Sequence, residues 1–202
     1  MTEKTRIGIY GGTFSPPHFG HVHAAREFLR AAELDRLLIM PAGIPPHKST
    51  EPGDDPYRRL QMCELAFSGM ETVEVSDYEI RKPGLSYTSD TLEHFAAADA
   101  ELCLLCGTDM FLTLDLWRRP ETIFSLAHIF GMRREDTDIS ELEEKAEAYR
   151  TRFGARVSII SSLPTPASST DIRSRLRAGE SCEGILPGAV LDYIVQNRLY
   201  ME

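Results

Sequence analysis

The chain has 202 residues, of which 42% are hydrophobic and 26% are charged. This composition is ordinary for a globular protein with one well-buried core. The formal net charge of −9 argues against a general nucleic-acid-binding protein, because such proteins need a basic face. No apolar run approaches the roughly 18 residues that cross a membrane, and the N-terminal residues do not resemble a secretion signal, so we expect a cytoplasmic protein.

Apolar runs typical of buried strands alternate with helical patterns along most of the chain. We expect strands at residues 6–10, 36–40, 72–75, 102–106, 128–131 and 156–160. We expect helices at residues 19–34, 57–67, 86–98, 141–152, 171–177 and 186–197. Strands that alternate with helices form a parallel sheet that is covered on both faces. The sequence therefore predicts an α/β fold, a single Rossmann-like, doubly wound domain over residues 1–202 with a small C-terminal helical piece at about residues 165–202.

The most informative segment follows the first expected strand and reads Gly-Gly-Thr-Phe-Ser-Pro-Pro-His-Phe-Gly-His, residues 11–21. Gly11 and Gly12 let the backbone come close to an anion, because no Cβ stands in the way. The expected helix start offers N–H groups and a positive dipole end, and His18 and His21 share one face there. The segment predicts a phosphate-binding corner. It matches neither G-x-G-x-x-G nor the Walker A pattern, so dinucleotide redox and P-loop functions lack their fingerprint.

Two alternative metal sites are disfavoured by geometry. His23 lies two residues beyond His21, about 200° round a helix, so the three histidines including His18 cannot converge on one ion. Cys103 and Cys106 fall in an expected strand, where residues three apart point to opposite faces. We therefore expect core thiols rather than a metal or redox pair, and assign no metal ligand.

The complete set of motifs resembles the nucleotidyltransferase superfamily. Residues 11–21 resemble its GGTFxPxHxGH signature, and Ala-Ser-Ser-Thr-Asp-Ile-Arg at residues 167–173 resembles its ISSTxIR signature. The intervening motifs are similar to those of bacterial nicotinate-nucleotide adenylyltransferases: Pro-Ala-Gly-Ile-Pro-Pro-His-Lys (41–48), Ser-Tyr-Thr-Ser-Asp-Thr-Leu (86–92) and Gly-Thr-Asp (107–109). The resemblance spans essentially the whole chain.

This resemblance implies a transferase of NAD biosynthesis that moves the adenylyl group of ATP to nicotinate mononucleotide, giving deamido-NAD and pyrophosphate. The mononucleotide phosphate is already an anionic nucleophile, so the reaction needs positioning and charge stabilisation and no general base. Mg²⁺ would arrive with ATP as a cofactor held by phosphate oxygens and water. The implied partners are ATP and nicotinate mononucleotide, with no nucleic acid and no membrane, and a homo-oligomer stays open.

The same resemblance assigns roles to individual residues. The catalytic residues would be His18, His21 and Arg173, which neutralise phosphate charge. The ATP site would comprise both signatures and the end of the fourth strand: Gly11, Gly12, Thr13, Phe14, His18, Gly20, His21, Gly107, Asp109, Ser169, Thr170 and Arg173. The mononucleotide site would comprise Lys48, Thr88, Asp109 and Trp117.

Several of these residues also have plain structural interpretations. Asp109 and Thr88 could cap helices, Lys48 could be a solvated loop lysine, and Trp117 could serve core packing. One residue departs from the family pattern, since Ser15 stands where Asp or Asn is common. That departure leaves open any role that needs a carboxylate at this point.

Three other functions stay open at this stage. A pantetheine-phosphate adenylyltransferase shares both signatures, although the PPHK loop and the SYTxxTL motif with the downstream Trp117 count against it. A preference for nicotinamide mononucleotide over nicotinate mononucleotide also stays open, because the two acceptors differ only in an amide in place of a carboxylate. A nucleotide-sensing domain without turnover would be expected to lose His18, His21 and Arg173, which are all present.

Overall fold

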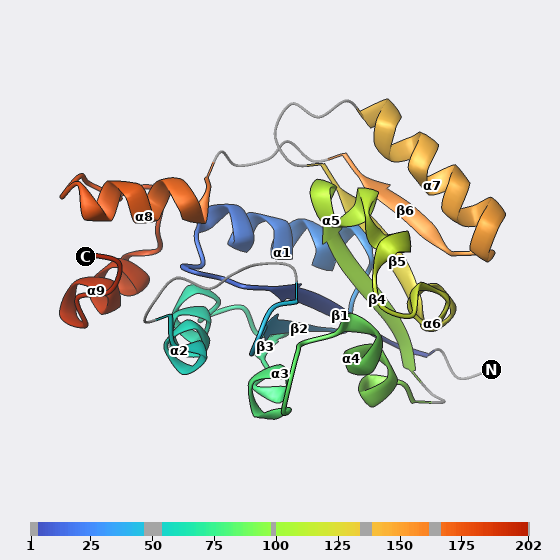
Figure 1. Cartoon of the computed structure of the whole chain (residues 1–202), viewed down its shortest axis with the longest axis horizontal. Coiled ribbons are helices and arrows are strands. Elements are labelled where there is room, and N and C mark those ends of the chain that lie inside the picture. Colours follow the sequence, from blue (N-terminus) through green and yellow to red (C-terminus); the bar gives the residue numbers. More distant parts are fainter. Residues whose placement is uncertain (1–3, 47–53, 98–99, 134–138, 162–166, 202) are drawn as a thin grey trace.

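Parallel strands form one central sheet (Figure 1). The computed structural model describes residues 4–46, 54–97, 100–133, 139–161 and 167–201. The strands of the 6-stranded sheet are β1 (Thr5–Gly12), β2 (Arg36–Pro41), β3 (Val73–Val75), β4 (Ala100–Gly107), β5 (Ala127–Met132) and β6 (Val157–Ile160). Their order is β3-β2-β1-β4-β5-β6, and every neighbouring pair is parallel. The α/β, Rossmann-like fold predicted from the sequence is therefore confirmed.

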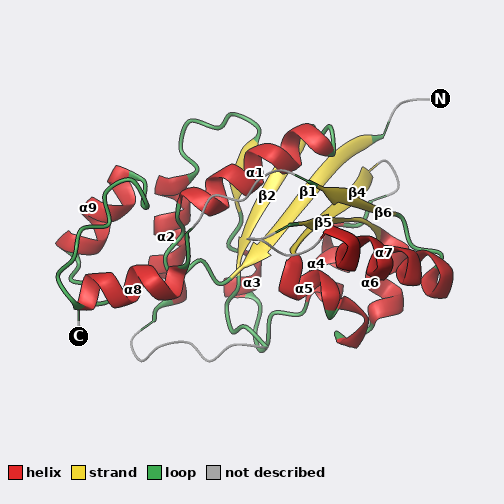
Figure 2. Ribbon diagram, turned by 90° about the horizontal axis from the view of Figure 1, so that it is seen from above, coloured by secondary structure: helices red, strands yellow, loops and turns green. Residues whose placement is uncertain are grey.

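Helices cover both faces of the sheet (Figure 2). One face packs against α1 (Phe19–Ala31) and α2 (Pro56–Ala66), and α8 (Ser169–Arg177) and α9 (Gly188–Gln196) extend the core cluster on this side beyond the sheet. The other face packs against α4 (Thr88–Phe95), α5 (Thr108–Leu112), α6 (Pro120–Leu126) and α7 (Ile139–Phe153). The short α3 (Tyr78–Arg81) and the 3-10 turn η1 (Leu114–Leu116) complete the elements. No helix within the described ranges is long and apolar enough to span a bilayer.

The central strands are buried on both sides because helices cover both faces. In β4 the run from Leu102 to Cys106 is buried throughout, which is why its sequence is continuously apolar rather than alternating. Cys103 belongs to the core cluster under α1 and Cys106 to the cluster under α7. The two thiols thus lie on opposite faces and in the core, as predicted.

The C-terminal helices α8 and α9 lie at one end of the molecule beside α2, far from the start of β1 (Figures 1 and 2). Ile172 of α8 and Val190 and Ile194 of α9 are buried in the same core cluster as Phe28 of α1. The helical piece is therefore packed against the sheet-bearing part through apolar side chains. This packing brings the start of α8 to the turn that joins β1 to α1.

Candidate active site

A cavity of about 490 Å³ lies at the carboxyl ends of β1 and β4. The strand order reverses between these two strands, which is where open parallel sheets bind ligands. Its size suits a small-molecule ligand. Every predicted site residue within the described ranges lines it: Gly11, Gly12, Thr13, Phe14, His18, Gly20, His21, Thr88, Gly107, Asp109, Trp117, Ser169, Thr170 and Arg173. Lys48 lies outside the described residues.

The two histidines form one unit at the start of α1. His18 occupies the N-cap position, and its ring lies 3.8 Å from that of His21 between centroids, at an interplanar angle of 33°. The backbone N–H of His18 donates to Nδ1 of His21 at 3.2 Å. An accepting Nδ1 carries no proton, so the neutral ring of His21 has its N–H at Nε2. The predicted sharing of one helix face is confirmed.

The start of α1 offers fewer open donors than the sequence led us to expect. The N–H of Phe19 donates to the carbonyl of Ile185 at 3.0 Å, and that of His21 donates to the carbonyl of His18 at 2.9 Å. Among the described residues, the N–H of Gly20 has no partner, and Gly20 lines the cavity. The helix start therefore keeps the open N–H of Gly20, whereas a carbonyl of the C-terminal piece and the carbonyl of His18 accept the other two.

The two signature motifs meet although they lie at opposite ends of the chain. Nη1 of Arg173 donates to the carbonyl of Ser15 at 2.9 Å, and Oγ of Ser169 donates to the carbonyl of Pro16 at 2.9 Å. Ser168 is the N-cap of α8, but its side chain makes no capping hydrogen bond. The Ser168 hydroxyl therefore does not cap the helix, and the hydroxyl of the neighbouring Ser169 joins the two motifs.

The turn between β1 and α1 contains a backbone that needs outside support. Phe14 has φ 53°, in the left-handed region that a bulky side chain seldom occupies. Such a residue costs roughly 1–3 kcal/mol and persists only where the surroundings hold it. Its ring is 2% exposed and packs edge-on against His21, with centroids 4.9 Å apart. The carbonyls on either side, of Thr13 and Ser15, both accept arginine hydrogen bonds.

A buried ion pair beside this turn escaped the sequence analysis, and its carboxylate residue, Asp54, belongs to the wall of the cavity. The side chain of Arg59 is 0% exposed and that of Asp54 is 3% exposed, with Nε 3.2 Å from Oδ1. Oγ of Ser15 donates to Oδ2 of Asp54 at 3.3 Å and lies 3.1 Å from the hydroxyl of Tyr200. Burial raises the pKa of Asp54, against the opposing effect of Arg59. Ser15 thus has no carboxylate of its own, but its hydroxyl contacts the carboxylate of Asp54.

The far wall of the cavity holds the predicted mononucleotide residues. Thr88 is the first residue of α4, whose N-cap is Tyr87, and Asp109 is the second residue of α5, whose N-cap is Gly107. Neither Thr88 nor Asp109 is a cap, so that interpretation was wrong for both. Trp117 lines the cavity and also packs against the core cluster under α7, so packing and ligand contact are compatible.

Acidic groups on the segments that form this wall are held by neighbours. The buried Glu79 accepts a hydrogen bond from Oγ1 of Thr91 at 2.6 Å, and burial raises its pKa. Hydrogen bonding from Lys82, aided by Arg119, lowers the pKa of Asp90. Within the described ranges, no group of three or more His, Cys, Asp and Glu side chains is placed to hold a metal ion.

Comparison with known proteins decides the family. The model of the cytidylyltransferase-like family matches residues 9–175. A Clostridium botulinum protein named "Probable nicotinate-nucleotide adenylyltransferase" is 36% identical over 197 residues, which cover 98% of each chain. The chain belongs to the nicotinate-nucleotide adenylyltransferase family. A Pseudomonas aeruginosa member with the same name is 36% identical over 208 residues, which cover 96% of this chain and 97% of that one.

Solved structures agree with the family at the level of the fold. The structure described as "Plasmodium falciparum nicotinic acid mononucleotide adenylyltransferase complexed with NaAD" superposes with a TM-score of 0.79 at 17% identity, over 97% of each chain. The same enzyme complexed with APC superposes with a TM-score of 0.77 at 16% identity. These likenesses show that this member of the family has the Rossmann-like architecture of those enzymes.

Proposed function

We propose that this protein transfers the adenylyl group of ATP to nicotinate mononucleotide, producing deamido-NAD and pyrophosphate. The observation that carries the proposal is the junction of the two signature motifs, through Arg173 to Ser15 and Ser169 to Pro16, at the edge of a nucleotide-sized cavity. Membership of the nicotinate-nucleotide adenylyltransferase family supports the choice of both substrates.

The chemistry is an in-line displacement at phosphorus. A phosphate oxygen of the mononucleotide attacks the α-phosphorus of ATP, and the bond to the β-phosphate oxygen breaks as pyrophosphate leaves with Mg²⁺. His18 and His21 hydrogen-bond the α- and β-phosphates, with Nε2 of His21 as donor. Arg173 and the N–H groups at the start of α8 meet the β- and γ-phosphates. Each of these groups stabilises charge where it develops, and no residue has to remove a proton.

The pyridine end is assigned to the opposite wall. Trp117 stacks on the nicotinate ring, and the start of α4 at Thr88 presents N–H groups to the carboxylate. The N–H groups of Thr88 and Ser89 have no partner among the described residues, which supports this assignment. Asp109 contacts a ribose hydroxyl.

The decisive experiment measures Mg²⁺-dependent pyrophosphate release from ATP with nicotinate mononucleotide, nicotinamide mononucleotide and phosphopantetheine as parallel acceptors. We expect a strong preference for the first. Preference for nicotinamide mononucleotide would agree with the mechanism but change the assigned substrate. Preference for phosphopantetheine would overturn the assignment. Folded protein that binds ATP and releases no pyrophosphate with any acceptor would indicate a sensing domain.

A further inference from the structure

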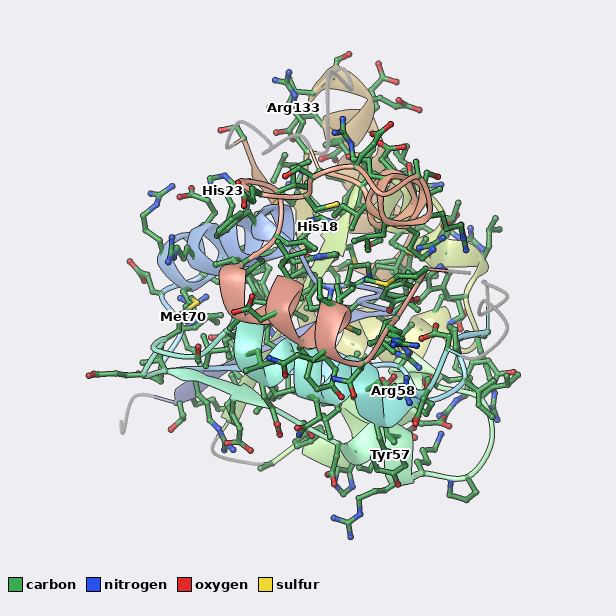
Figure 3. The ribbon with its side chains drawn as sticks, turned by 90° about the vertical axis from the view of Figure 1, so that its left-hand side faces the viewer. His18, His23, Tyr57, Arg58, Met70 and Arg133 are labelled. Carbon is green, nitrogen blue, oxygen red and sulfur yellow. The ribbon has the colours of Figure 1, made fainter. Side chains whose placement is uncertain are left out.

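The starting observation is an arginine on the apolar face of α2. Arg59 is buried together with Met62, Cys63 and Ala66, which follow it at helical spacing. Its neighbour Arg58 is exposed on the outer side of the same helix (Figure 3). A fully buried guanidinium cannot reach a ligand in the cavity, so the role of Arg59 must be sought in what its donors hold.

Each side of the Arg59 fork has a partner in a different segment. Nη1 donates to the carbonyl of Thr13 at 2.8 Å, Nη2 donates to the carbonyl of Gly43 at 3.2 Å, and Nε faces Oδ1 of Asp54. Thr13 begins the β1–α1 turn, and Gly43 follows β2. Arg59 therefore ties the turn to the adjacent loop, while Asp54 balances its charge.

A second chain of hydrogen bonds ends on the same turn. Ser15 has one hydroxyl proton and donates it to Oδ2 of Asp54, so the hydroxyl of Tyr200 must be the donor to Oγ of Ser15. Burial raises the pKa of Tyr200 to about 12, so it keeps this proton at neutral pH. Tyr200 has φ 61°, in the left-handed region, which shows that its surroundings fix its place.

These contacts lie on both sides of Phe14, whose backbone conformation is unfavourable for a bulky residue. Phe14, with φ 53°, lies between the carbonyl held by Arg59 and the carbonyl held by Arg173. The Ser15 hydroxyl between them is fixed by Asp54 and Tyr200. We call Ser15, Asp54, Arg59 and Tyr200 the Ser15 cluster.

We propose that Asp54, balanced by Arg59 and completed by Tyr200, is a positioning residue that acts through Ser15 to hold the β1–α1 turn in the geometry that binds ATP phosphates. This inference rests on the proposed function only in placing those phosphates at the turn. A buried ion pair is in itself weak support for stability. The directions of its hydrogen bonds, all toward the turn or the loop beside it, point to positioning.

The test uses three variants, two of which have matched controls. Asp54→Asn removes the charge, Ser15→Ala removes the hydroxyl through which Asp54 acts, and Tyr200→Phe removes one terminal donor. Asp55→Asn changes the same charge at the exposed neighbour, whose Oδ1 caps α2 through the N–H of Tyr57, a cap that Asn preserves. Tyr57→Phe, at a tyrosine that is 55% exposed, is the control for Tyr200→Phe.

Each protein is assayed at 25 °C for ATP binding by calorimetry, for kcat and KM with both substrates, and for its melting temperature. We expect Asp54→Asn and Ser15→Ala to lower kcat/KM for ATP by about tenfold to hundredfold, because small displacements of a positioning element are costly. ATP binding should weaken, the KM for the mononucleotide should change little, and the controls should stay within about twofold. Tyr200→Phe should fold even if Asp54→Asn does not, and it should lower kcat/KM for ATP by a smaller factor.

A double variant separates positioning from general structural damage. If Asp54 acts through Ser15, adding Asp54→Asn to Ser15→Ala should produce little further loss, whereas independent effects would multiply. Multiplying losses, or a lowered melting temperature with unchanged ATP binding and kcat/KM, would overturn the proposal. Because ATP binding needs no acceptor, this readout remains valid if the wild-type enzyme proves inactive with nicotinate mononucleotide.

Discussion

His21 gives the sharpest test of the proposed chemistry, because its two ring nitrogens have different surroundings. Nδ1 accepts the backbone N–H of His18 at 3.2 Å, so the ring donates through Nε2. Glutamine carries an amide N–H at about the reach of Nε2, whereas the amide of asparagine reaches only the place of Nδ1. We therefore expect His21→Gln to keep part of the activity that His21→Asn and His21→Ala lose.

The expected magnitude follows from the number of interactions removed. Loss of one donor to developing phosphate charge costs about 10²–10³ in kcat, or about 2.7–4 kcal/mol in the barrier. The hydrogen bond from His18 contributes only about 1 kcal/mol to folding, against a total stability of roughly 5–15 kcal/mol, so His21→Ala should stay folded. The assay is pyrophosphate release with both substrates saturating, beside urea unfolding of each variant.

Two results would refute this reasoning. An alanine variant within about threefold of the wild-type kcat, less than 1 kcal/mol in the barrier, would remove His21 from the chemistry. Equal activity of the glutamine and asparagine variants would instead refute donation through Nε2, since only the reach of the amide differs between them.

Three further predictions concern the cavity walls and the loop that follows β2. A Cβ added at Gly43 would lie 2.4 Å from the carbonyl oxygen of Glu79. Gly43→Ala should therefore lower the free energy of unfolding, measured in urea, by about 1–3 kcal/mol. Gly188→Ala is the control and should change it little, because an added Cβ there meets nothing within 4 Å. Because burial raises the pKa of Glu79, its contribution to stability is present below the unfolded pKa of about 4.3 and is lost as pH rises through the folded pKa. Glu79→Gln should therefore raise the melting temperature at pH 8 and not at pH 4, whereas the exposed Glu71→Gln should change neither. Trp117→Ala should raise the KM for the mononucleotide more than the KM for ATP in steady-state kinetics, and equal rises would favour a packing role.

The sheet and the convergence of the strand-end motifs at one edge were both predictable from sequence, because both follow from a parallel sheet that is covered on its two faces. A strand covered on both faces must be apolar at successive positions, and the run from Leu102 to Cys106 shows this directly. Parallel strands end at one edge, so Gly12 at the end of β1 and Gly107 at the end of β4 had to lie near each other.

Only one feature of the sequence indicated the Ser15 cluster. Arg59 stands first in a helical pattern whose other members are apolar, and a charge on that face signals a buried partner. No local pattern identifies the partners, because Asp54 and Tyr200 lie 39 and 185 residues from Ser15 along the chain. Such contacts depend on how distant elements pack, which propensity and periodicity do not describe.

The short helices were missed for a different reason. α5 has 5 residues and α6 has 7, which is too few for a helical period to stand out. Helices this short do not form alone in water, and here they depend on burial of Phe111 and Ile123 against the sheet. Their positions still matter for the site, because α5 carries Asp109 to the edge of the cavity.

An enzyme whose substrate is already a nucleophile gains rate mainly by placing charged groups around the reacting phosphates. In this structure, polar contacts are concentrated at the β1–α1 turn. Arg173 illustrates how one side chain can serve both placement and charge. Nη1 holds the carbonyl of Ser15 and Nη2 donates to Oγ1 of Thr170 at 3.4 Å, so the planar fork is oriented by the turn and by α8 together. Displacing the turn would therefore displace this cation as well, and in the proposed mechanism this couples the buried Asp54 to the phosphates through Ser15. A lysine has no rigid fork and could not keep both orienting contacts, which is a physical reason for arginine at this position.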